Sequence, residues 1–316
     1  MIGDLIYSIG GLAMLAVASD QFVKGAVRLA VVMRVAPVIV GSVVVGFGTS
    51  APEMVVSAVA AADDNLDIGV GNIIGSNVAN ISLVLGCATL LASVPVQRAT
   101  LRREVPISVG SVLLFAALLQ GELSRLEGLV LIVVLVTVLG YVLQASRREQ
   151  RVRVGEEISD LVGEEAPSTF PEVVRTTMAL SGVVIAAWLV VTGAEGIADE
   201  LDLTGGFIGF TLVAVGTSAP ELFTAVAAAR RNEIELLIGN LLGSNMFNSL
   251  AVGGAIALVG PGQPEDGDLV VWGSVLMVAV VLASAIVMIT KRRVARLEGF
   301  FLVVAWMACV AILRAL

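Results

Sequence analysis

Histidine is absent from the 316-residue sequence, which excludes every mechanism that needs an imidazole base, a histidine metal ligand or a histidine pH switch. Cysteine is scarce: Cys87 and Cys309 lie inside apolar runs, and neither has the CxxC or metal-ligand spacing of a redox or zinc site. We interpret both as packed thiols. The sequence therefore argues against an enzyme and predicts no cofactor.

Charge is also scarce, since 15% of residues are charged and 57% are hydrophobic, with a mean hydropathy of +0.97. This composition lies outside the soluble class and predicts a membrane protein in contact with the lipid bilayer. The formal net charge of −8 argues against nucleic acid as a partner. The first apolar run opens at Met1–Asp4 without a basic region, so we expect a retained helix there instead of a cleaved signal peptide.

Long apolar stretches fill most of the chain, and each is long enough to cross a bilayer, which takes about 20 residues. Only helices or closed barrels satisfy the backbone in lipid, and these stretches lack the alternation of barrel strands. The fold class predicted is thus an all-α polytopic membrane protein with ten transmembrane helices. Their expected ranges are 4–31, 37–61, 68–94, 104–121, 125–145, 173–198, 205–229, 236–260, 268–290 and 295–315.

The basic residues predict the orientation of these spans. With ten spans, 17 of the 19 Lys and Arg residues fall on one side, and only Arg125 and Arg314 fall on the other. The positive-inside rule then predicts a multi-pass protein of the cell membrane with both termini outside. The charged 146–171 loop is predicted to be a cytoplasmic linker, because it is too short to form a domain of its own.

An internal repeat divides the chain into a first five-helix unit, 1–145, and a second, 172–316. An ungapped shift of 168 residues aligns Gly41–Gly86 with Gly209–Gly254 and gives 18 identities in 46 positions, many of them polar or small residues. Because five is an odd number of spans, the second unit is predicted to be inverted in the membrane. Inverted repeats with helices interrupted at matching positions point to a secondary transporter whose site lies at the repeat interface.

The repeated motifs suit a hard cation. Pro52 and Pro220 each remove a backbone donor inside an expected span, so both helices should break and expose carbonyl oxygens. Glu53 and Glu221 follow directly, and a carboxylate at membrane depth costs roughly 2.5–3.5 kcal/mol on insertion scales. Hydroxyls share a helix face with each carboxylate, and Asn72, Ser76 and Asn80 form a stripe at i, i+4 and i+8 on the next span. Calcium takes about 6–8 such oxygen ligands.

Other interpretations of these residues are structural. A Ser, Thr or Asn in a membrane helix often bonds locally or between helices. Two glutamates can also be protonated acids that bond within the bundle. Duplication of the whole constellation favours the cation site over both.

The two motifs, Gly48–Glu53 with Gly71–Asn80 and Gly216–Glu221 with Gly239–Asn248, resemble the alpha repeats of the sodium/calcium exchangers in the calcium/cation antiporter superfamily. The likeness extends over both halves and is greatest with compact prokaryotic members. It implies exchange of calcium for sodium, or for protons in some branches, by alternating access, with the first and sixth spans sliding across a rigid core.

The resemblance also implies the ion ligands. Many family members carry Asp where this chain has Asn248, so the site here holds at most two formal negative charges. The implied ligands are Thr49, Ser50, Glu53, Ser76 and Asn80 in the first half, Thr217, Ser218, Glu221, Ser244 and Asn248 in the second, and the backbone carbonyls of Gly46 and Ala214.

The function predicted is an antiporter of Ca²⁺ and Na⁺ in which these inorganic cations compete for the two glutamates. The alternative is a proton/calcium exchanger, since a carboxylate at a site of low dielectric can carry a proton. A passive cation channel would need an open pore lined by acids or carbonyls, which the paired broken helices disfavour.

Overall fold

The computed structural model describes residues 1–32, 50–149, 169–231 and 234–316, and these are almost entirely helical. The elements are α1 (Ile2–Val32), α4 (Ala51–Ala62), α5 (Leu66–Ala79), the π-helical turn η2 (Asn80–Val84), α6 (Leu85–Leu91), β1 (Val94–Pro95), α7 (Arg98–Arg102), α8 (Glu104–Leu119), α9 (Arg125–Glu149), α11 (Thr169–Leu201), α12 (Gly205–Ile208), η3 (Gly209–Val213), α13 (Ala214–Thr217), α14 (Ala219–Arg231), α15 (Ile234–Phe247), η4 (Asn248–Val252), α16 (Gly253–Val259), η5 (Leu269–Gly273), α17 (Ser274–Lys291), β2 (Arg293–Val294) and α18 (Arg296–Ala315).

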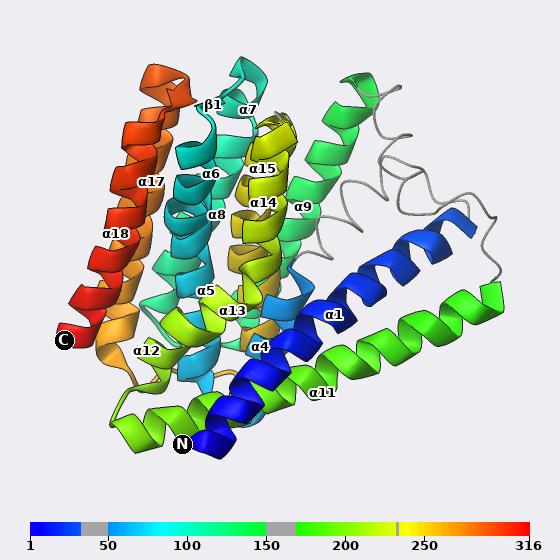
Figure 1. Ribbon diagram of the computed structural model, residues 1–316, viewed down its shortest axis with the longest axis vertical. Coiled ribbons are helices and arrows are strands. Elements are labelled where there is room, and N and C mark those ends of the chain that lie inside the picture. Colours follow the sequence, from blue (N-terminus) through cyan, green and yellow to red (C-terminus); the bar gives the residue numbers. More distant parts are fainter. Residues whose placement is uncertain (33–49, 150–168, 232–233) are drawn as a thin grey trace.

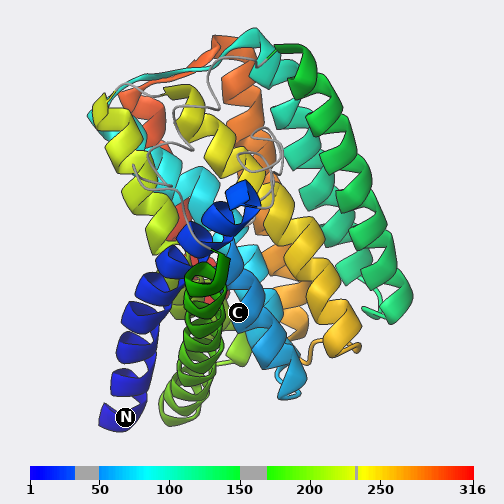
Figure 2. The same cartoon turned by 90° about the vertical axis from the view of Figure 1, so that its right-hand side faces the viewer.

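Two long helices form a layer of their own. α1 and α11 lie side by side and cross the upright helices obliquely (Figure 1), and Figure 2 shows both of them in front of the bundle. An ion pair joins them near one end, where Arg28 Nη1 lies 3.1 Å from Glu172 Oε1. The layer packs against α4, which carries Glu53, against α13, which carries Thr217, and against η3.

The centre of the upright bundle consists of the two most buried spans. Within the span Leu66–Leu91, 83% of residues are buried in the most apolar window, and within Leu237–Val259 the share is 78%. The corresponding shares are 17% for Arg125–Val142 and 11% for Arg296–Ala315, which lie at the periphery. Polar residues of the two central spans are thus shielded from lipid.

The two halves pack against each other in an equivalent way. α6 contacts α18, and its counterpart α16 contacts α9. In the segment that follows α6 in the chain, Val94 pairs with Val294 in the antiparallel β1–β2 ladder. In the segment that follows α16, Gly262 forms an antiparallel bridge with Leu123. Val94 and Gly262 are 168 residues apart, which is the offset of the sequence repeat. The folded chain therefore repeats the same cross-half contacts twice.

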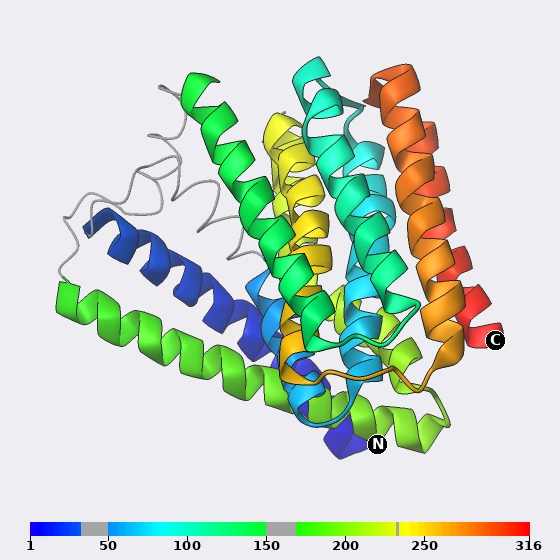
Figure 3. The ribbon, with the colours of Figure 1, turned by 180° about the vertical axis from the view of Figure 1, so that it is seen from behind.

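The direction of the chain reverses between the two central spans. From α5 to α6 it ascends in Figure 1, whereas the α15–α16 segment descends, and Figure 3 shows the same from behind. Both chain ends lie towards the same end of the bundle. These directions are those expected of an inverted repeat.

The all-helical membrane fold predicted from the sequence is confirmed, while the count of ten spans stays a prediction. Seven helices of the described residues are long and apolar enough to cross a membrane, and the bent pair Gly205–Thr217 and Ala219–Arg230 makes an eighth. Of the remaining two expected spans, α8 has 16 residues, and 37–61 is described only from residue 50 onward. The 146–171 linker lies mostly outside the described residues, between Glu149 at the end of α9 and Thr169 at the start of α11.

Candidate cation-binding site

Both motif helices begin at the same kind of turn. Ser50 (φ −93°, ψ 9°) precedes α4, and Ser218 (φ −83°, ψ 6°) separates α13 from α14. The first backbone bonds of the two helices also match, because Met54 N donates to Ser50 O and Leu222 N to Ser218 O, each over 3.1 Å. The helix axis bends by 44° between Thr217 and Ala219. The predicted break at the second motif is confirmed, and its cause is the proline that follows the turn.

A π-helical turn begins at the last asparagine of each repeated motif. η2 starts at Asn80 and η4 at Asn248, again 168 residues apart. Such turns are rare in α-helices and recur at functional sites, because they widen the helix and redirect its side chains. Both asparagines are buried, at 0% and 1% exposure.

Glu53 and Glu221 are both buried, each at 1% exposure. Ser218 Oγ donates to Glu53 Oε1 over 3.2 Å, so the turn of the second half reaches the carboxylate of the first. Within the described residues neither carboxylate forms an ion pair with a basic side chain.

Several oxygen atoms of the predicted ligands are buried without a partner. Among the described residues, seven buried oxygens of the predicted ligands have no hydrogen-bond partner: Glu53 Oε2, both carboxylate oxygens of Glu221, Ser50 Oγ, Ser244 Oγ, Asn80 Oδ1 and Asn248 Oδ1. Buried polar atoms are ordinarily satisfied, so such a set calls for an occupant. The described residues include no group of three or more Cys, Asp or Glu side chains placed to hold a metal ion, so an occupant would be bound by two carboxylates and neutral oxygens. This ligand set suits Ca²⁺ or Na⁺ and contains no soft donor.

Hydrogen bonds connect several of the predicted ligands. Thr217 and Ser76 both donate to the side chain of Asn72, over 3.1 Å and 3.4 Å. The carbonyl of Ala214 accepts from Ser218 N over 3.0 Å, and Thr217 Oγ1 lies 3.3 Å from the same carbonyl oxygen. The two predicted ligands that lie outside the described residues are Thr49 and Gly46.

Two asparagines that were not predicted as ligands, Asn72 and Asn245, form hydrogen bonds with residues that were. Asn72 bonds to Ser76 and Thr217, and Asn245 Oδ1 accepts from Asn80 Nδ2 over 3.1 Å. Asn245 Nδ2 in turn donates to the backbone carbonyl of Asn77 over 3.1 Å. That carbonyl can only accept, so the amide of Asn245 is oriented, and Asn80 is left with its own Oδ1 free for an ion. Repetition of both asparagines at the 168-residue offset is the sequence signal for this role.

Glycines allow the two motif regions to come this close. A Cβ atom on Gly71 would lie 2.4 Å from the carbonyl oxygen of Gly206, and one on Gly75 would lie 2.3 Å from that of Phe210. No side chain fits at either position. The short distance between α5 and the α12–η3 segment is what brings Thr217 and Ser218 to the first-half residues.

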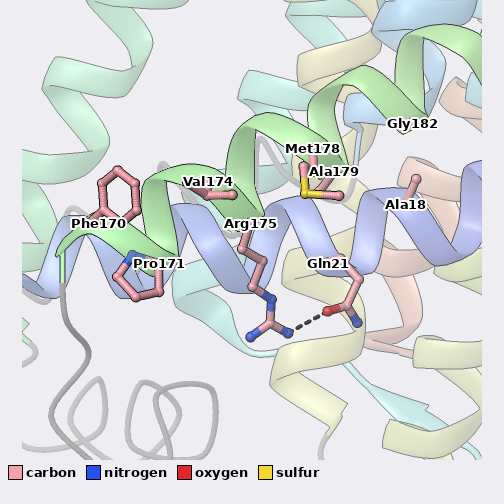
Figure 4. A pocket seen from close by; sticks show the side chains of 9 residues that line it. All are labelled: Ala18, Gln21, Phe170, Pro171, Val174, Arg175, Met178, Ala179 and Gly182. Atoms are coloured by element: carbon pink, nitrogen blue, oxygen red, sulfur yellow. Dashed lines mark hydrogen bonds between the residues drawn. The ribbon is translucent and has the colours of Figure 1, made fainter.

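A groove of about 570 Å³ lies away from these residues, between α1 and α11. Figure 4 shows the residues that line it. Arg175 donates a hydrogen bond to Gln21, and the apolar surface is supplied by Phe170, Val174 and Met178. None of the predicted ligands lines it.

Comparison with known proteins agrees with this geometry. The family model described as "Sodium/calcium exchanger protein" matches residues 4–144 and 172–314. The chain is 29% identical to the sodium/calcium exchanger MaX1 of Methanosarcina acetivorans, with 96% of each chain covered, and 27% identical to a Ca(2+)/H(+) antiporter of Aphanothece halophytica, with 74% of this chain and 70% of the relative covered. A solved structure of the sodium-calcium exchanger NCX_Mj, soaked with 10 mM Na⁺ and zero Ca²⁺, superposes with a TM-score of 0.65 at 29% identity and 98% coverage of both chains.

The chain belongs to the sodium/calcium exchanger protein family, a family of cation antiporters and not of enzymes. It is an integral membrane protein, and its substrates are inorganic cations.

Proposed function

We propose that this protein exchanges Ca²⁺ for Na⁺ across the cell membrane by alternating access. The observation that carries the proposal is the pair of buried glutamates, Glu53 and Glu221, which have no basic partner among the described residues. Ser218 of the second half donates to Glu53, and further oxygens of predicted ligands in both halves are buried without a partner. Buried charges are costly unless they are paired, and a bound cation is the pairing that such a site offers. The relatives named sodium/calcium exchangers, which match nearly the whole chain, support the choice of ions.

Competition between the ions explains why transport is coupled. One Ca²⁺ or two Na⁺ ions would neutralise the two carboxylates, and either load would use the same oxygens, so full occupancy by both is excluded. An empty site would leave two unneutralised carboxylates at membrane depth, which opposes passage of the unloaded protein between its two states. Exchange without leak follows from these two conditions.

The proposed ligands are those that both halves of the repeat supply. The side chains are Thr49, Ser50, Glu53, Ser76, Asn80, Thr217, Ser218, Glu221, Ser244 and Asn248, and the backbone carbonyls are those of Gly46 and Ala214. The α1–α11 layer packs on the elements that carry the second set of hydroxyls. Sliding of this layer would open the site to either side in turn.

The membrane placement belongs to the same proposal. It consists of two inverted five-helix repeats, 1–145 and 172–316, with the 146–171 linker in the cytoplasm and both termini outside. The clustering of basic residues on one side supports this orientation.

A second candidate function is exchange of Ca²⁺ for protons. It is favoured by the similarity to the Aphanothece halophytica relative named a Ca(2+)/H(+) antiporter. Two buried carboxylates can carry protons as well as bind ions. Asn80 and Asn248 stand where additional acids would extend the proton capacity, and their neutrality favours sodium.

Uptake of radioactive calcium into proteoliposomes separates the two candidates. We expect uptake to be driven by an outward sodium gradient and to be absent in Glu53→Gln. Uptake driven only by an outward proton gradient would keep the site and establish proton exchange. Absence of gradient-driven uptake under both conditions would mean that calcium is the wrong substrate.

A further inference from the structure

We propose that Ser57 and Asn72 form a hydrogen-bond relay that turns the hydroxyl protons of Thr217 and Ser76 away from the bound cation, so that both oxygens offer it lone pairs. The inference rests on the proposed cation site. Ser57 and Asn72 are positioning residues in it and do not touch the ion.

The relay starts at a group that can only accept. Ser57 Oγ donates to the backbone carbonyl of Gly69 over 3.3 Å, and Asn72 Nδ2 donates to Ser57 Oγ over 2.9 Å. Asn72 Nδ2 also donates to the backbone carbonyl of Glu53 over 3.3 Å. Because neither carbonyl can donate, the amide nitrogen of Asn72 must face them, and its Oδ1 must face the opposite way.

That orientation determines where two hydroxyl protons point. Asn72 Oδ1 accepts from Thr217 Oγ1 over 3.1 Å and from Ser76 Oγ over 3.4 Å. A hydroxyl has one proton and two lone pairs, so each oxygen keeps its lone pairs for another partner. With both donors and both acceptor positions in use, the amide of Asn72 is fully satisfied at 0% exposure. Its orientation is therefore fixed, and the two hydroxyls are held as cation ligands.

The relay also protects a backbone ligand. Thr217 Oγ1 lies 3.3 Å from the carbonyl of Ala214, which is an alternative acceptor for the same proton. If Asn72 turned, the Thr217 proton would shift entirely to that carbonyl and occupy a lone pair that the proposed site uses for sodium.

Only the first half of the repeat has this arrangement. At the 168-residue offset, Ala225 replaces Ser57 and Leu237 replaces Gly69, although Asn240 repeats Asn72. Ser57 shares a face of α4 with Glu53, one turn further along, and is 0% exposed.

The test compares Ser57→Ala with Ser111→Ala, a loss of a buried hydroxyl that bonds only within its own helix α8, to Ile107 O. Ca²⁺ and Na⁺ affinities are read from half-maximal uptake and from the cation-dependent rise in Tm of the purified protein. A lost hydrogen bond of about 0.5–1.5 kcal/mol corresponds to a rise of roughly two- to twelvefold in the half-saturating concentration. We expect that rise in Ser57→Ala, an affinity close to that of the unmutated protein in Ser57→Thr, and no change in Ser111→Ala.

A double-mutant cycle with Thr217→Val distinguishes the relay from a general loss of packing. We expect the effect of Ser57→Ala on affinity to shrink in the Thr217→Val background, because the proton it controls is gone. An unchanged affinity in Ser57→Ala, or an effect that is fully additive with Thr217→Val, would overturn the relay while leaving the proposed function intact. If the unmutated protein itself showed no cation-dependent uptake and no cation-dependent rise in Tm, both the relay and the proposed function would be overturned.

Discussion

Ser218 Oγ donates a hydrogen bond of 3.2 Å to Glu53 Oε1, across 165 positions of sequence. The bond links the turn between α13 and α14 to a carboxylate in the first turn of α4. It joins a residue of the second repeat to one of the first, as expected if both repeats contribute to one site. The predictions below test that arrangement.

Removing the Ser218 hydroxyl should weaken cation binding. Ser218→Ala deletes both a proposed ligand and a donor to a buried carboxylate, and a bond of this kind contributes about 1.5–3 kcal/mol. We expect the half-saturating Ca²⁺ concentration to rise about tenfold or more in proteoliposome uptake. Ser111→Ala, which removes a hydroxyl bonded to Ile107 O in its own helix, is the control. Equal affinities in the two variants would remove Ser218 from the site.

Neutralising either central carboxylate should abolish exchange. Glu53→Gln and Glu221→Gln each leave a single negative charge for a divalent ion, so we expect gradient-driven calcium uptake to fall to the level of empty liposomes. Glu127→Gln is the matched control, because its carboxylate bonds to Ser124 at the start of α9, away from the site. Full transport in either central variant would contradict the assignment of the pair.

A third acid in the site should make transport depend on pH. Asn248→Asp is neutral and close to asparagine in shape while protonated, so we expect it to behave like the unmutated protein at low pH. As the pH rises and the added carboxylate ionises, Ca²⁺ should bind more tightly and the maximal rate should fall. The measurement is uptake across a pH series at fixed sodium gradient. Identical profiles for the two proteins would show that residue 248 does not face the ions.

Close contact between the halves should be sensitive to a single methyl group. Gly71→Ala would place Cβ 2.4 Å from the carbonyl oxygen of Gly206, and overpacking of this kind costs about 1–3 kcal/mol. We expect a lower Tm and slower exchange. At Gly110 in α8 a Cβ would meet no atom of the described residues within 4 Å, so Gly110→Ala should be neutral or slightly stabilising in the same thermal scan. A Tm for Gly71→Ala equal to that of Gly110→Ala would contradict the close approach.

The membrane class, the family and the broken helix at Pro220 were predictable from the sequence, because each depends on local properties. Apolar runs of about 20 residues indicate membrane spans whatever their neighbours, and the 168-residue repeat records the motif residues directly. Span counting was less secure: α8 has only 16 residues, and the break at Ser218 divides one span into shorter helices.

Only the tertiary structure decided which motif residues bond to one another. Thr217 and Asn72 are 145 positions apart, and Asn80 and Asn245 are 165 apart, so their pairing depends on how helices of opposite halves cross. The hydrogen bonds of Ser57 also depend on the fold. The repeat does not point to this residue, because Ala225 stands at its position in the second half. Sequence specifies which oxygens are available, whereas the direction of each hydroxyl proton follows from acceptors that the folded chain brings within hydrogen-bond distance.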